Sequence, residues 1–146
     1  MKKILILTFA LFTIHLSFAQ KSEKEIVDRF FELYKTNTNE AVNYIYGLNK
    51  WIDLEGEAVR NVRDKLNQYK ELVGTYYGEE FIYKGEFGQS FVTYIYLVKY
   101  ERQPIRFTFK FYKAKDTWMT YSFSFDDNFD EEFEEIIRNE YMRGKR

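Results

Sequence analysis

The sequence contains no cysteine, and its one histidine, His15, lies in an apolar segment near the N-terminus. The absence of cysteine excludes disulfide bonds, thiol nucleophiles and thiolate ligands for zinc. The rest of the chain has no imidazole, the group most often used for proton transfer near neutral pH and for binding zinc or copper. We therefore expect no metal site and no cofactor, and any chemistry rests on carboxylate, Lys, Arg, Tyr and hydroxyl side chains.

The chain also lacks an excess of charge of either sign. Its 22 basic and 23 acidic residues give a net charge of −1. Nucleic-acid binding draws most of its affinity from the neutralisation of phosphates, so a mildly acidic chain is a poor candidate for it. After residue 19, no run approaches the ~20 apolar residues that a membrane-spanning helix needs. We expect neither a nucleic-acid partner nor a membrane span beyond that point.

Residues 1–19 are typical of a secretory signal peptide. Lys2 and Lys3 form a basic start, residues 4–16 are mostly apolar, and Ser17 and Ala19 are small residues that suit signal peptidase. The alternative is a retained membrane anchor, for which the apolar run is short, while the absence of cysteine excludes a lipoprotein. We predict cleavage after Ala19 and export to the periplasm or the extracellular space.

Helical spacing dominates the first half of the remaining chain. Ser22 and Glu25 are spaced as a capping box, and an apolar face follows at helical intervals. The expected helices begin after Ser22, cover about 40–46 up to a left-handed Gly47, run from a cap at Asp53 to Gly74, and cover about 129–142 at the end of the chain.

After Gly74 the hydrophobic period changes from 3.6 to 2, which is typical of strands. The residues are rich in Tyr, Phe, Val, Ile and Thr, which suit a half-buried sheet, and the single proline, Pro104, falls in a turn. The expected strands cover 81–84, 90–101, 105–113 and 117–125, with a turn or bulge at 85–88. The order predicts an α+β fold in one domain over 20–146: N-terminal helices packed on a strongly curved, cone-like antiparallel sheet, with a C-terminal helix.

Alternation within the strands predicts which side chains face the helices. Apolar residues at 105, 107, 109 and 111 alternate with polar ones. An even-length turn over 101–104 would pair Tyr100 with Ile105 and Val98 with Phe107. An odd-length turn near 114–116 would place Met119, Tyr121, Phe123 and Phe125 on the same core face and leave Trp118 pointing away.

The opposite face of the expected sheet is less polar than a solvated face should be. Phe91, Ile95, Leu97 and Tyr112 lie there among Lys99, Arg106 and Lys110. Three interpretations remain open: a homodimer interface, a ligand surface, and ordinary scattered exposure of apolar residues combined with coverage by the last helix. The three basic residues would suit an anionic glycan or lipid, or they form an ordinary solvated stripe.

The order of elements and the run Phe107-Thr-Phe-Lys-Phe-Tyr, continued through Trp118 to Phe123-Ser-Phe-Asp126, resemble the nuclear transport factor two-like (cystatin-like) superfamily. The resemblance covers about residues 23–125 and is nearest to small secreted bacterial members of unknown function. It implies a sheet wrapped around the first helix, a pocket at the open end of the cone, and dimerisation through the outer sheet face. Enzymatic members use a His or an Asp in the pocket, often with a Tyr. The histidine is missing here, and no motif places the Asp.

Aromatic side chains are the main candidates for a binding site. A concave aromatic pocket with a few hydroxyl groups suits a small apolar or sugar-like ligand. The alternative is that the same side chains only fill the core, with Trp51 packed near the second and third helices. The six residues that we place in the pocket are Tyr44, Trp51, Tyr94, Tyr96, Phe109 and Tyr121.

Acidic motifs are weaker candidates for a metal site or a catalytic site. Asp126, Asn128 and Asp130 match the first three positions of a calcium loop, but Glu131 and Ile137 stand where that loop needs glycine and a bidentate glutamate. Asn128 and Glu131 are better explained as a capping box for the last helix. Carboxylates at 53–57 and 79–80 could transfer protons only if they were buried with a shifted pKa. We assign no catalytic and no metal-binding residue.

Together these patterns favour an exported, non-catalytic binding or interaction module with an aromatic-lined pocket. One alternative is an enzyme of the isomerase or hydratase kind, which would use Tyr and a carboxylate. Such an enzyme requires an acid with a raised pKa inside the cone, beside a Tyr hydroxyl. Another alternative is an immunity or inhibitor protein that binds a secreted partner.

Overall fold

Helices come first along the chain and strands follow, as the change of hydrophobic period predicts. The computed structural model describes residues 21–128 and 130–144, so the predicted signal peptide lies outside the described residues. The elements within this part are α1 (Glu23–Thr36), α2 (Thr38–Gly47), α3 (Glu57–Val73), β1 (Tyr76–Phe87), β2 (Phe91–Tyr100), β3 (Ile105–Lys113), β4 (Trp118–Asp126) and α4 (Asp130–Arg143).

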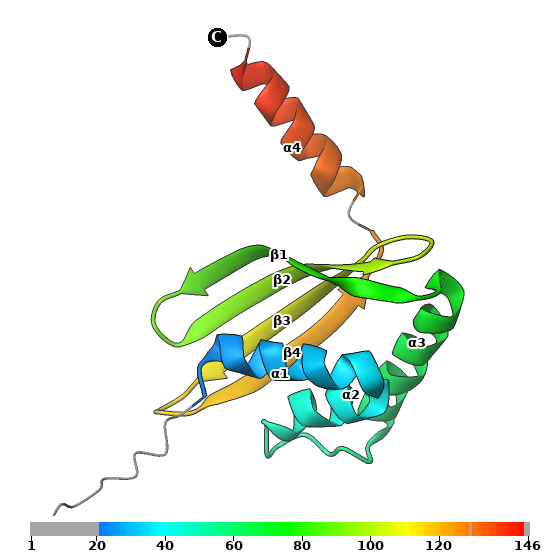
Figure 1. The fold of residues 1–146 in the computed structure, drawn as a ribbon. Coiled ribbons are helices and arrows are strands. Elements are labelled where there is room, and N and C mark those ends of the chain that lie inside the picture. Colours follow the sequence, from blue (N-terminus) through cyan, green and yellow to red (C-terminus); the bar gives the residue numbers. More distant parts are fainter. Residues whose placement is uncertain (1–20, 129, 145–146) are drawn as a thin grey trace, which may run out of the picture.

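The four strands form one open antiparallel sheet in the order β1-β2-β3-β4, so neighbours in sequence are neighbours in space. α1 lies across one face of the curved sheet, with α2 and α3 beside it (Figure 1). We call this the inner face and the opposite one the outer face. α4 extends away from the end of β4 and covers neither face (Figure 1). The predicted α+β fold, with N-terminal helices on a curved antiparallel sheet and a C-terminal helix, is confirmed.

The core is an aromatic cluster between α1 and the inner face. The ring of Phe30 lies 4.9 Å from that of Phe109 and 5.0 Å from that of Phe123, measured between centroids. Such edge-to-face and tilted pairs add to the hydrophobic gain of burial. The hydroxyl groups of Tyr34 and Tyr100 hydrogen-bond to each other within this cluster. Burial raises the pKa of Tyr34 to about 12, although the bond to Tyr100 opposes this shift.

The first helix begins as predicted. The Ser22 hydroxyl accepts from the Glu25 N–H, and the Glu25 carboxylate accepts from the Ser22 N–H. The predicted boundaries of the next two helices, α2 and α3, were partly wrong. α2 begins earlier than expected, because the Asn37 side chain caps it, and Gly47 is not left-handed. α3 begins after Gly56, because the Asp53 carboxylate accepts from the Glu55 N–H and so stabilises a turn.

Sheet faces follow the prediction in the two central strands. Tyr94, Tyr96, Val98 and Tyr100 of β2 share the inner face with Phe107, Phe109 and Phe111 of β3, and all are buried. The pairing itself is displaced by two residues from the prediction, since Val98 rather than Tyr100 is opposite Ile105. A displacement by two residues keeps every side chain on its face, so the predicted core residues of these strands are correct although the predicted register is not.

The prediction fails in the first half of β4. The pairing changes register between Lys110 and Phe111, so that Tyr121 is an extra residue in β4. A bulge of this kind reverses the alternation on the strand that contains it. Phe123 and Phe125 stay on the inner side, but Tyr121 is 62% exposed, and Thr120 and Trp118 take the inner positions that we expected for Tyr121 and Met119.

Candidate functional site

The inner face of the sheet is covered by the protein's own side chains. Phe30 and Tyr34 of α1 are fully buried there against Phe107, and Phe109 is fully buried as well. Phe109 was expected to line a ligand pocket, whereas the structure places it in the centre of the core. The centre of the inner face is therefore filled, and the open space on this side lies at its margin.

A cleft of about 710 Å³ lies at that margin, between the first half of α1 and the strands β1 and β2. Its floor is aromatic. The ring of Phe81 packs edge-to-face against Tyr94 and Tyr96, at centroid distances of 6.3 and 5.7 Å. Tyr96 in turn packs against Phe31 of the core at 5.0 Å, so the floor is continuous with the core cluster.

A bulge in β1 determines which side chains reach this cleft. Phe81 pairs with Tyr96, but Tyr83 pairs with Ile95, so Ile82 is an extra residue. The extra residue sends Tyr83 to the outer face and turns Lys84 inward beside Tyr94. Alternation alone would predict the reverse for both side chains.

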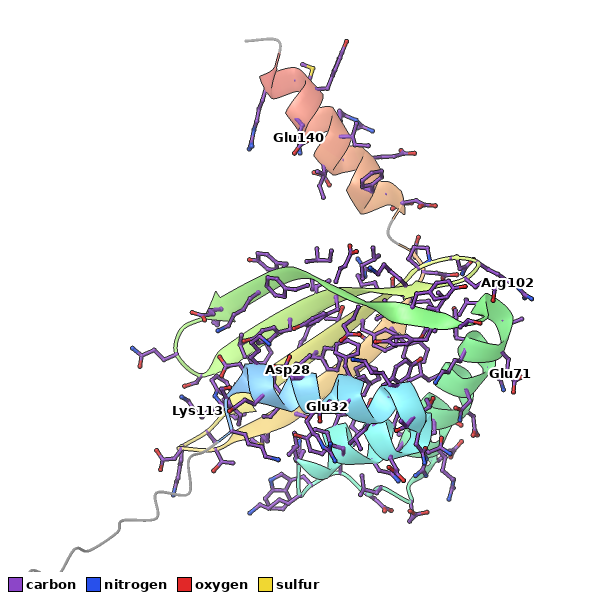
Figure 2. The ribbon with its side chains drawn as sticks, viewed as in Figure 1. Asp28, Glu32, Glu71, Arg102, Lys113 and Glu140 are labelled. Atoms are coloured by element: carbon purple, nitrogen blue, oxygen red, sulfur yellow. The ribbon has the colours of Figure 1, made fainter. Side chains whose placement is uncertain are left out.

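Charged groups form the rim of the cleft. The Lys84 ammonium lies 3.0 Å from a carboxylate oxygen of Glu23 and 2.8 Å from one of Glu86. Hydrogen bonds to Glu86 and then to Glu23 raise the pKa of Lys84, so it is a cation at every physiological pH. Asp28 of α1, labelled in Figure 2, and Glu79 of β1 also line the cleft.

The tyrosine hydroxyls of the cleft remain protonated. Burial raises the pKa of Tyr96 to about 12, with smaller contributions from the charges of Asp28, Tyr94 and Glu79. The pKa of Tyr94 is raised too, chiefly by burial. Neutral hydroxyl groups can both donate and accept hydrogen bonds. The cleft thus combines an aromatic floor with hydroxyl, ammonium and carboxylate groups.

A carboxyl group suited to general acid catalysis has a raised pKa. For Glu23, burial acts to raise the pKa, but a backbone hydrogen bond and the ion pair with Lys84 outweigh it and lower the pKa. Glu23 therefore stays ionised at neutral pH and accepts hydrogen bonds without supplying a proton. Among the described residues, no three His, Cys, Asp or Glu side chains are grouped as a metal site.

The six predicted site residues are not brought together. Tyr94 and Tyr96 line the cleft. Tyr44 lies on α2 with Lys21 above its ring, and its hydroxyl has no hydrogen-bond partner within the described chain. Trp51 is 79% exposed, so the expectation that it packs between the helices was wrong. Tyr121 lies on the outer face beside Phe91.

Sequence reasoning missed Phe81, Lys84 and Glu23. The β1 bulge conceals the first two, because it breaks the period of 2 on which assignment to a face depends. Glu23 lies in the first turn of α1, and no local signal pairs it with Lys84, which lies 61 residues away. The calcium-loop motif gave no site within the described part of the chain, and the expected cap of α4 adjoins Phe129, which lies outside it.

Within residues 21–128 and 130–144, no helix is both long and apolar enough to cross a membrane. No family model, curated protein or solved structure matches this chain.

Proposed function

We propose that the protein is an exported, non-catalytic binding module that holds a small sugar-like ligand in the cleft between α1 and the β1–β2 hairpin. The observation that carries the proposal is the combination of Phe81, Tyr94 and Tyr96 in one floor with Lys84 and Asp28 at the rim. Sugars present apolar C–H faces and a ring of hydroxyl groups, so a sugar site needs an aromatic surface for the first and polar groups for the second.

The polar rim favours a sugar-like ligand over a purely apolar one. An apolar ligand would cover Lys84, Glu23 and Asp28 without replacing their hydrogen bonds to water, which costs free energy. A polyol replaces these bonds with its own hydroxyl groups. The ammonium and the carboxylates supply donors and acceptors in one cleft, so each hydroxyl of a sugar can find a partner of the right kind.

The chemistry of the cleft supports binding more than catalysis. Glu23 is an ionised acceptor, and the tyrosine hydroxyls hold their protons strongly because their pKa values are raised. General acid–base catalysis is most efficient when a pKa lies near the working pH. The enzymatic alternative requires a carboxyl group with a raised pKa, and Glu23, whose pKa is lowered, does not meet this requirement.

Amide NMR titration with cellobiose, maltose and chitobiose tests the proposal. We expect at least one disaccharide to shift the amides of residues 79–84 and 94–96, while 1-hexanol leaves them in place. Phe81→Ala should abolish the shifts because it removes part of the floor. The matched control is Phe87→Ala, another exposed phenylalanine of β1 that lies on the outer face. Shifts that persist in Phe81→Ala, or an effect of 1-hexanol alone, would contradict the proposal.

A further inference from the structure

α4 carries an apolar stripe whose side chains are about half exposed or more. Phe133, Ile136 and Ile137 lie on one side of the helix at helical spacing, with exposed fractions of 60%, 55% and 49%, and Tyr141 continues the stripe. α4 shares no extensive contact with any other described element. Its side chains, Glu140 among them, stand clear of the sheet (Figure 2). An amphipathic helix normally buries such a stripe.

The outer face of the sheet carries a matching apolar row. Phe87, Phe91, Tyr112 and Met119 are opposite one another on β1, β2, β3 and β4, so they form one line across all four strands. Phe87 is 85% exposed, and Tyr121 adds its ring beside Phe91 at 5.1 Å. The row is therefore a contiguous apolar surface that is exposed at Phe87 and Tyr112 and partly exposed at Phe91 and Met119, the kind of surface that interaction sites use.

The row and the stripe agree in length. Three gaps between neighbouring strands of ~4.8 Å each give the row a length of ~14 Å. Phe133 and Tyr141 are eight residues apart on α4, which corresponds to ~12 Å at the rise of an α-helix. A helix laid across the strands therefore covers the row from β1 to β4.

The two surfaces are also complementary in charge. α4 contains six acidic and two basic residues, a net charge of −4. The outer face carries Lys99, Arg106 and Lys110 against only Glu80 and Asp126. Lys99 pairs with Glu80 and Arg106 with Asp126, whereas Lys110, two residues before Tyr112 on β3, has no ion-pair partner within the described chain. Opposite charges of this kind orient and accelerate association.

The connection between β4 and α4 directs the helix away from its own sheet. Arg106 holds Asp126 through two hydrogen bonds, of 3.3 and 2.8 Å, and the same carboxylate accepts from the Asn128 N–H at 3.2 Å. Gln103, in the β2–β3 turn, donates to Asp127 at 3.3 Å. These bonds hold the chain up to Asn128 where it leaves the sheet, and α4 lies clear of both sheet faces (Figure 1).

We propose that α4 docks across the outer sheet face of a second copy of this chain, and that the second copy returns its own α4 in the same way. The stripe of each helix then covers the Phe87–Met119 row of the other copy, and acidic residues of the helix reach Lys110. The exchange gives a two-fold symmetric dimer with two equivalent contacts, which together bury the stripe and the row of both copies. This inference concerns the outer face and does not depend on a ligand in the inner cleft.

Sedimentation equilibrium of the purified protein tests the exchange. We expect a dimer at micromolar concentration, and a rise of about tenfold or more in its dissociation constant in the double variant Phe133→Gln/Ile137→Gln. Glutamine keeps the helix and adds no charge. The matched control is Met142→Gln, which changes an exposed apolar residue on the opposite side of α4 and should leave the dimer intact.

A second pair of variants tests the charge contribution. Lys110→Glu should weaken the dimer and reduce its dependence on salt, whereas Lys65→Glu makes the same change on the exposed side of α3 and should have no effect. A protein that stays monomeric overturns the proposal. A dimer that withstands Phe133→Gln/Ile137→Gln but dissociates on Phe87→Gln also overturns it, because the two sheets would then pack face to face without α4.

Discussion

Both faces of the sheet carry aromatic side chains, but the outer face is more polar and the two faces differ in what covers them. The inner face buries Tyr96, Phe107 and Phe109 under α1, while the outer face leaves Phe87 and Tyr112 exposed. Three helices precede the sheet and all lie on its inner side (Figure 1). Aromatic content alone therefore does not identify a core, because the position of the preceding helices decides which face is buried.

The largest expected difference between the faces is in stability. Phe109→Ala should lower the free energy of unfolding by about 3–5 kcal/mol, because it leaves a cavity in the core cluster. Phe87→Ala should change it by less than about 0.5 kcal/mol, because the side chain stays exposed. Urea unfolding followed by circular dichroism measures both, in the Phe133→Gln/Ile137→Gln background so that association does not contribute. Equal losses would show that the two faces are not distinguished by burial.

A smaller effect comes from the buried pair of hydroxyl groups under α1. Tyr34→Phe removes one hydroxyl and leaves that of Tyr100 without its partner. We expect a loss of about 1–3 kcal/mol, the cost of a buried unsatisfied group. Tyr34→Phe/Tyr100→Phe should lose less than the sum of the single changes, since no hydroxyl is then left unpaired. Additive losses in the double-mutant cycle would mean that the two groups act separately.

The inner face should also respond to pH. The pKa of Tyr96 is 10.0 in its ordinary state and about 12 in the folded protein, because burial favours the neutral hydroxyl. The unfolded chain therefore loses this proton near pH 10 while the folded chain keeps it, and stability falls as pH rises from 10 towards 12. The stability advantage of the protein over Tyr96→Phe should be constant below pH 10 and shrink above it, as measured by urea unfolding across this range. A stability advantage that grows as the pH rises above 10 would contradict this prediction.

The smallest difference concerns one ion pair on each face. Lys84 and Glu23 are partly covered in the cleft, whereas Lys99 and Glu80 lie on the outer face and are more exposed. Lys84→Met and Lys99→Met should each cost less than about 1 kcal/mol, as surface pairs do. We expect the larger loss for Lys84→Met, because Lys84 also pairs with Glu86 and its pair with Glu23 is screened less by water and salt. The unfolding midpoints of the two variants, measured at increasing salt concentration, check which variant loses more stability.

Much of the architecture could be predicted from local signals. The capping box at Ser22 and the apolar positions that follow it identified α1 and its buried side, and strict alternation gave β3 its bounds. These signals work because a helix face and a strand face each have a fixed period. The register of β2 against β3 could not be predicted, because it depends on the length of the turn at 101–104 and not on either strand alone.

The candidate site was predicted only in part, and bulges are the main reason. Tyr94 and Tyr96 lie in a regular strand, and both line the cleft. Tyr121 lies at the β4 bulge, where alternation gave it the wrong face, and Lys84 follows the β1 bulge, which conceals its position. A bulge depends on pairing with the neighbouring strand, which the amino-acid pattern of one strand does not reveal. The exposure of Trp51 depends on the path of a loop, for which the chain has no periodic signal.

All the extra residues in this sheet lie in its edge strands. Tyr77 and Ile82 are unpaired in β1, and Tyr121 is unpaired in β4, while β2 and β3 run without interruption. An open sheet with two long aromatic edges is a template for the addition of further strands, as in amyloid. Interrupted edges cannot offer a continuous ladder of N–H and C=O groups to an incoming strand. The same irregularities that redirect side chains thus protect a chain without disulfides from fibril growth.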